Sequence, residues 1–140
     1  MHTLRLSEWG CFLRAVTSVR VRNRACAWRG ARLPHSFEWQ YAAQGPDNDG
    51  RKYPWGNDTD PSLYPTPTTD GGVRPAPVGA HSPLGDSPFG VRDLVGNVWQ
   101  WTATEFVDAH TRSVIVRGSS SYVPLTKYAA RVIERAPLPR

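Results

Sequence analysis

The sequence predicts a single α+β domain with little regular secondary structure. The chain has 140 residues, which is room for one hydrophobic core. Its 13 prolines and 12 glycines interrupt most candidate helices and strands. Six tryptophans argue against a disordered chain, because disordered chains are usually poor in aromatic residues. We therefore expect one helix, a few short strands and long loops held in place by tryptophans or by metal ions.

The first two candidate elements lie in the N-terminal third of the chain. The segment SVRVRNRACAW (18–28) alternates apolar residues with arginine, which is typical of a strand but equally compatible with a segment outside any fold. The segment SFEWQYAA (36–43) spaces its aromatic residues and alanines three and four apart, which predicts a helix. Pro34 precedes this helix, and Gly45 with Pro46 ends it.

The middle of the chain, residues 45–90, is a succession of turn signals with no long apolar run. A loop of this length in a compact domain is usually functional or pinned by something. Within it, APVG (76–79) is a candidate short strand. Further on, VWQWT (98–102) and SVIVRGSS (113–120) alternate as strands do. We expect the tryptophans at 99 and 101 to pack in the core around the first of these strands.

The net charge of +5 comes from one end of the chain. Residues 1–35 hold seven arginines and one glutamate, and the remainder is nearly neutral. We do not expect nucleic-acid binding, because these arginines are scattered and no nucleic-acid-reading motif flanks them. No apolar run approaches the roughly 18 residues of a membrane span. Arginines also interrupt every apolar stretch of a possible secretory signal, so we expect a cytoplasmic protein without membrane association.

Five motifs occur in a characteristic order, and together they resemble the formylglycine-generating enzyme family, also called the sulfatase-modifying-factor family. The resemblance covers residues 25–121, leaving 1–24 as a basic segment and 122–140 as a divergent C-terminal tail. It implies a C-type-lectin-like α+β fold. The motifs are ARLPHSFEWQYAAQG (31–45), YPWGN (53–57), APVG (76–79), SPFGVRDLVGNVWQWT (87–102) and VIVRGSSS (114–121).

The resemblance also implies a structural calcium ion at the D-L-V-G-N-V-W-Q segment. Hard oxygen donors supplied by a tight turn are suitable calcium ligands. Gln100 stands where the family usually has glutamate, which keeps one oxygen donor but removes a negative charge, so we expect weaker binding. The alternative is that Asp93 is a turn-forming or capping carboxylate. The implied ligands are the Asp93 carboxylate, the Gly96 and Val98 carbonyls and the Gln100 side chain.

A second calcium site is implied further upstream. Asp70 matches a family aspartate that precedes P-V-G, and the Gly72 carbonyl lies beside it. Ser62 and Asp60 are the candidates for its upstream partner. The alternative is that Asp70 is an ordinary turn aspartate.

The copper chemistry of the family is not supported by this chain. The resemblance places two copper-binding cysteines shortly after Arg117, near Val123 and Tyr128, and residues 102–140 contain no cysteine. Cys11 and Cys26 form neither a disulfide framework nor a zinc site, and Cys26 is expected to be a small buried residue.

Iron is not supported either, because the histidines show no metal-ligand spacing. These histidines are His2, His35, His81 and His110.

The resemblance therefore implies a formylglycine-generating-enzyme-like domain of doubtful activity. The chemistry of the family is oxygen-dependent oxidation of a protein cysteine, or related non-heme metal oxidoreduction, and a sulfatase-type protein or peptide is the implied partner. The alternative is a non-catalytic C-type-lectin-like binding module. Family features stop abruptly on both sides of 25–121, so we expect an incomplete domain that lacks edge strands and has no closing strand within 122–140.

Overall fold

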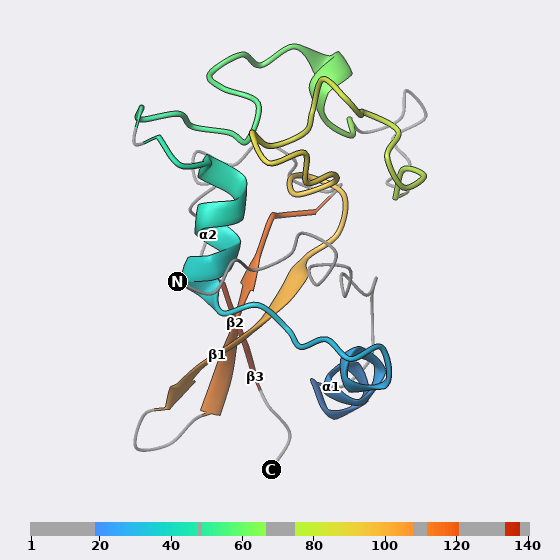
Figure 1. Ribbon diagram of the computed structural model, residues 1–140, viewed down its shortest axis with the longest axis vertical. Coiled ribbons are helices and arrows are strands. Elements are labelled where there is room, and N and C mark those ends of the chain that lie inside the picture. Colours follow the sequence, from blue (N-terminus) through green and yellow to red (C-terminus); the bar gives the residue numbers. More distant parts are fainter. Residues whose placement is uncertain (1–18, 48, 67–74, 108–111, 121–133, 138–140) are drawn as a thin grey trace.

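The chain folds into a small α+β structure, seen in a computed structural model that describes residues 19–47, 49–66, 75–107, 112–120 and 134–137 (Figure 1). Two helices, α1 (Val19–Trp28) and α2 (Ser36–Gln44), precede a three-stranded antiparallel sheet in the order β1-β2-β3. The strands are β1 (Gln100–Val107), β2 (Arg112–Arg117) and β3 (Glu134–Pro137). The predicted α+β class is confirmed. None of the described helices is long and apolar enough to cross a membrane.

Helix α2 forms where the sequence predicts it. At its C-terminal end, Gly45 has φ +82° and donates its N–H to the Tyr41 carbonyl at 2.9 Å. A side chain at Gly45 would lie 2.7 Å from Pro88, so this end of the helix also requires glycine for space. The buried face of α2 packs against β1 and β2, whereas Phe37 and Tyr41 remain 71% and 55% exposed. The buried residues of α2 are Ser36, Trp39, Ala42 and Ala43.

The first segment is a helix, so both interpretations offered by its sequence are wrong. Residues 19–28 form α1 rather than a strand or a segment outside the fold. Arginine and alanine have high helix propensity, and an alternating pattern of this length does not exclude a helix. The C-terminal end of α1 is anchored by Cys26, which is fully buried with Leu33 in a small cluster against Ala31 and Trp101.

Strand β1 carries polar residues on its buried side. Gln100 and Thr102 are 7% and 0% exposed, while Trp99 and Trp101 are only partly buried. The Thr102 hydroxyl donates to the Ile115 carbonyl of β2 at 2.7 Å, which satisfies it inside the sheet. The two tryptophans therefore flank the core instead of filling it.

The main core lies between α2 and the loops rather than within the sheet. Its buried members are Trp39, Ala43, Tyr53, Leu94 and Val95. Trp39 is fully buried, as the sequence suggests for a core anchor.

Within the described parts of the loops between α2 and β1, residues 61–63 form the single-turn 3₁₀ helix η2 (Pro61–Leu63). Trp55 stacks on Tyr53 and Tyr64, and its indole donates to the Asp58 carbonyl at 2.9 Å. Tryptophan anchoring of the loops is thus confirmed. The predicted strand at 76–79 is wrong, because residues 76 and 77 have no regular structure and residues 78 and 79 lie in a turn; the Ala76 backbone is hydrogen-bonded to the Asn97 side chain.

The expectation of no closing strand within 122–140 is also wrong. Strand β3 pairs antiparallel with β2 from Val116↔Glu134 to Ser113↔Pro137. Its four residues show no alternation of apolar and polar residues, so periodicity does not reveal it. Backbone pairing with the available edge of β2 decides its structure, and the proline lies at its end, where a missing N–H is tolerated.

Candidate functional site

The strongest sequence motif folds into a tight turn, residues 93–100, which we call the 93–100 turn. Asp93 adopts φ +56° and Gly96 φ +82°, so the backbone reverses sharply at two points. The Gly96 N–H donates to the Gly118 carbonyl at 2.7 Å, which joins the turn to the end of β2. These contacts bring the turn against the sheet rather than leaving it as a surface loop.

Gln100 links the turn to α2. The Trp39 indole Nε1–H donates to Gln100 Oε1 at 2.6 Å, and Gln100 Nε2 donates to the Asp93 carbonyl at 2.6 Å. Gln100 is 7% exposed and Trp39 is fully buried, so the hydrogen bond between them is buried, whereas the one to Asp93 is partly buried. A buried polar side chain with both ends paired stabilises one arrangement of the two segments that it joins.

Two other side chains of the turn hold the preceding loop. Asp93 Oδ2 accepts the N–H of Gly79 at 2.8 Å. The Asn97 amide accepts the N–H of Ala76 at 2.9 Å and donates to the carbonyl of the same residue at 3.1 Å. Asn97 is 3% exposed, and its side chain pairs with both the N–H and the carbonyl of residue 76.

The residues that the sequence assigned to the first calcium site thus lie on one turn, and both ends of the Gln100 amide have hydrogen-bond partners. Its oxygen accepts from Trp39, and the group that it directs at the Asp93 backbone is an amide donor. Within the described residues, no group of three or more histidine, cysteine, aspartate or glutamate side chains is arranged to hold a metal ion. The Asp93 carboxylate accepts the Gly79 N–H through Oδ2 at 2.8 Å, and the first calcium site stays a prediction.

The second predicted calcium site lies mostly outside the described residues, which exclude Asp70 and Gly72. Its two candidate partners contact each other instead. Asp60 Oδ1 accepts the N–H of Ser62 at 2.8 Å and caps η2, and this backbone hydrogen bond lowers the pKa of Asp60. The second site stays a prediction.

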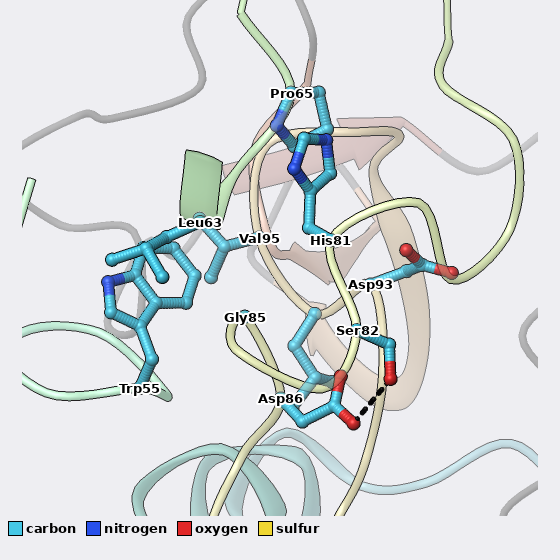
Figure 2. Close-up of a pocket in the computed structure, with 10 residues that line it drawn as sticks. Trp55, Leu63, Pro65, His81, Ser82, Gly85, Asp86, Asp93 and Val95 are labelled. Atoms are coloured by element: carbon cyan, nitrogen blue, oxygen red, sulfur yellow. Dashed lines mark hydrogen bonds between the residues drawn. The ribbon is translucent and has the colours of Figure 1, made fainter. Parts of the chain in front are cut away.

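A small pocket adjoins the 93–100 turn, and Figure 2 shows the side chains around it. Its cavity volume is about 10 Å³, roughly what a single water molecule requires. Ser82 Oγ donates to Asp86 Oδ2 at 2.8 Å, whereas His81 Nδ1 contacts the Ser62 carbonyl at 2.9 Å. The histidine is therefore not paired with this serine and aspartate, and the pocket is too small for an organic substrate. Its lining residues are Trp55, Leu63, Pro65, His81, Ser82, Gly85, Asp86, Asp93, Leu94 and Val95.

An open groove of about 510 Å³ runs along α2, and we call it the α2 groove. At its base, Arg117 is 6% exposed and donates to Ser36 Oγ at 2.7 Å and to Gln40 Oε1 at 3.0 Å. Burial lowers the pKa of Arg117. Gln40 Nε2 is buried without a hydrogen-bond partner in the part of the chain that the structure describes. The residues lining the groove are Ser36, Phe37, Gln40, Tyr41, Gln44, Thr104, Ile115 and Arg117.

Sequence reasoning did not identify this groove. The sequence pointed to this region only through Arg117 of the R-G-S motif, and nothing in the motif shows that this arginine is buried. Its contacts to Ser36 and Gln40 join residues about 80 positions apart, and periodicity does not report contacts of that range.

The cysteine prediction requires a correction. Cys26 is fully buried, as expected, but it is disulfide-bonded, which the sequence did not lead us to expect, and its partner lies outside the described residues. Val123 and Tyr128, together with His2 and His110, also lie outside the described residues. His35 precedes α2 and stacks on Phe37.

Comparison with known proteins gives one family and several relatives. Residues 18–136 match the family described as sulfatase-modifying factor enzyme 1-like domain. The chain is 41% identical over 104 residues to the inactive C-alpha-formylglycine-generating enzyme 2 of Bos taurus, covering 68% of this chain and 34% of that protein. Identity to the hercynine oxygenase of Mycobacterium tuberculosis is 43% over 82 residues, which is 56% of this chain and 18% of that protein.

The formylglycine-generating enzyme of Mus musculus is 36% identical over 98 residues, which is 61% of this chain and 25% of that protein. The chain therefore spans about a third or less of the length of these relatives.

Proposed function

Because the chain belongs to the sulfatase-modifying factor enzyme 1-like family, we propose that it is a formylglycine-generating-enzyme-like domain that binds and does not oxidise. The observation that carries this proposal is the cysteine inventory. Its only cysteines are Cys11 and Cys26, and the resemblance places Val123 and Tyr128 where copper ligands are needed. Cys26 is disulfide-bonded, so it offers no thiolate.

The chemistry supports the same conclusion. Copper(I) is a soft ion that requires soft thiolate or thioether ligands. The described residues also contain no cluster of histidines and carboxylates that would hold iron. One relative of 41% identity bears the name of an inactive enzyme, which agrees with a scaffold that has no redox centre of its own.

We assign the binding role to the α2 groove, and we propose an extended peptide of a sulfatase-type protein as its occupant. Phe37 and Tyr41 offer exposed aromatic surface at its rim. Ser36 and Gln40 contribute polar side chains to its lining. The combination of aromatic surface with a few placed polar groups is typical of peptide-binding sites.

We propose a C-type-lectin-like arrangement, supported by the single helix α2 packed on a three-stranded sheet and by the long loops between α2 and β1. An experimental structure of the chain whose strand order or helix position differed from this arrangement would contradict it.

The catalytic part of the proposal is tested with a cysteine-containing sulfatase peptide. The full chain is incubated with copper(I), oxygen and the peptide, and the peptide is examined by mass spectrometry. We expect no conversion of cysteine to formylglycine. Conversion with multiple turnovers by the unmodified chain contradicts the proposal. The double variant Val123→Cys, Tyr128→Cys is the matched comparison, and we expect it alone to bind copper(I).

The binding part is tested with the same peptide carrying serine in place of cysteine and a fluorescent label. We expect anisotropy to rise with the unmodified chain and the dissociation constant to increase about tenfold in Tyr41→Ser, because the aromatic contact is lost. Leu84→Ser is the control, since Leu84 is 67% exposed and does not line the groove. Equal binding by both variants, or none by the unmodified chain, contradicts the assignment.

The calcium site at Asp70 and Gly72 also remains a proposal, supported by the motif alone. Calorimetric titration of calcium into the unmodified chain and into Asp70→Asn measures it. Loss of the binding heat in the variant supports the site, and an unchanged heat argues against it.

A further inference from the structure

We propose that the Gln100 carboxamide does not serve as a calcium ligand in the 93–100 turn and instead ties this turn to α2 by its own hydrogen bonds, so that the turn needs no metal. The inference concerns the folding of the scaffold and does not depend on whether the chain binds a peptide. It rests on the orientation of the amide, on the burial of its partners and on the packing of Gly118.

The orientation of the Gln100 amide is determined by Trp39. An indole N–H can only donate, so the atom of Gln100 at 2.6 Å from Trp39 Nε1 must be the oxygen. The nitrogen then faces the Asp93 carbonyl, also at 2.6 Å. The two ends of one amide thereby satisfy a donor on α2 and an acceptor in the turn.

This orientation opposes Gln100 as a calcium ligand in the turn. The group on that side is an NH₂, which has no lone pair to offer and directs its positive ends at the turn. A calcium ion requires six to eight oxygen ligands at roughly 2.3–2.6 Å. Rotating the amide to present its oxygen would place NH₂ against the indole N–H, leaving two buried donors facing each other.

Gly118 encloses the amide from the side of the sheet. A Cβ at this position would lie 3.2 Å from Gln100 Nε2 and 2.5 Å from the Leu94 carbonyl oxygen. The Gly118 carbonyl accepts the Gly96 N–H at 2.7 Å, so the backbone directly after β2 is also in contact with the turn. The amide therefore lies in a close-packed position between two backbone segments.

The electrostatics agree with this placement. A glutamate at position 100 would direct a negatively charged oxygen at the Asp93 carbonyl, and two oxygen atoms at such a distance repel unless a cation lies between them. Glutamine removes the charge and replaces that oxygen by a donor. The Asp93 carboxylate is stabilised separately, because it accepts the Gly79 N–H at 2.8 Å.

Thermal unfolding with calcium and with chelator tests the inference. Every chain carries Asp70→Asn, so that calcium at the second predicted site does not contribute. The chain with this substitution alone is called the parent. We expect the Tm of Gln100→Glu in chelator to be lower than that of the parent. In excess calcium the Tm of this variant should rise by roughly 5 °C, since a ligand that binds only the folded state raises the Tm. The Tm of the parent should differ by less than about 1 °C between calcium and chelator, because a chain that does not bind calcium gains no stability from it.

Gln100→Met is the matched control, because methionine has a similar length but offers neither a strong donor nor an oxygen. Its Tm should fall equally in calcium and in chelator. A parent Tm that rises with calcium, with the rise abolished by Asp93→Asn, overturns the inference. Identical Tm values of Gln100→Glu in both buffers also overturn it.

A calorimetric titration keeps the inference testable if Gln100→Glu does not fold. Calcium is titrated into the parent and into its Asp93→Asn variant. Equal heats in the two chains support the inference, and a binding heat that only the parent shows overturns it.

Discussion

Gly118 is a residue whose identity follows from two separate requirements. Its φ of +89° lies in the left-handed region, and a side chain there would lie 2.5 Å from the Leu94 carbonyl. We expect Gly118→Ala to lower the free energy of unfolding by roughly 2–4 kcal/mol, combining backbone strain with a steric clash. Urea denaturation measures the change.

Gly90→Ala is the control for backbone strain alone. Gly90 has φ +71° but open space where a side chain would be placed. Its substitution should cost only about 1 kcal/mol. Equal losses in the two variants would show that the contact with Leu94 is unimportant.

Glu38 makes the start of α2 sensitive to pH. Hydrogen bonds from the Arg32 guanidinium, at 2.6 and 2.7 Å, are the largest cause that lowers the pKa of Glu38 from 4.5 to about 2, and the His35 N–H adds to it. Because the folded-state pKa is the lower one, the stabilisation is complete above pH 4.5 and is lost as the pH falls toward 2.

We expect Glu38→Gln to lose roughly 1 kcal/mol at neutral pH, a modest value because Arg32 is 59% exposed and solvent screens the pair. The free energy of unfolding of the variant should also depend less on pH between about 4.5 and 2. Denaturation series across this range measure both effects, with the exposed Asp47→Asn as control. Parallel pH profiles for all three chains would contradict the assignment.

The loop at residues 75–79 is an element held by side chains of another segment. Both hydrogen bonds of Asn97 go to the Ala76 backbone. We expect Asn97→Ala to increase amide hydrogen exchange in residues 75–81 at least tenfold, because the loop loses two partly buried hydrogen bonds. Mass spectrometry of peptic fragments measures this.

Asn57→Ala is the matched control for that experiment. Asn57 is exposed and accepts only the N–H of Lys52 within its own loop. Exchange in residues 75–81 should not change. If Asn97→Ala also leaves exchange there unchanged, the loop is held by other contacts.

Helix α2 was predictable as an element because three local signals agree on it: Pro34 before it, Gly45 after it, and helical spacing between them. Helix α1 was not predictable, because the alternation of arginine with apolar residues favours a strand locally. Cys26, which is buried in the structure, lies near the C-terminal end of this helix. Strand β3 and the loop at 76–79 depend on partners distant in the sequence, namely β2 and Asn97. No local pattern encodes such pairing.

At the scale of the molecule, the disulfide at Cys26 stabilises the N-terminal side of the structure. Cys26 is fully buried against Leu33. We expect Cys26→Ser to lose roughly 2–4 kcal/mol of unfolding free energy, the usual range for a native disulfide. Reductant should lower the Tm of the unmodified chain and leave that of the variant unchanged. Two freely titrating thiols in the non-reduced, unfolded chain would contradict this.

The sequence by itself determined the family, the α+β class, helix α2 and the absence of copper-binding cysteines after Arg117. These features depend only on residue identity and on local spacing, and both can be read without knowing any tertiary contact. Only the tertiary structure decided what Gln100 does. Its two partners, Trp39 and Asp93, are separated from each other by more than fifty positions, and a glutamine read in the sequence shows only that an oxygen and a donor are both present. The buried indole decides which of them faces the turn, because a donor must meet an acceptor where water is excluded.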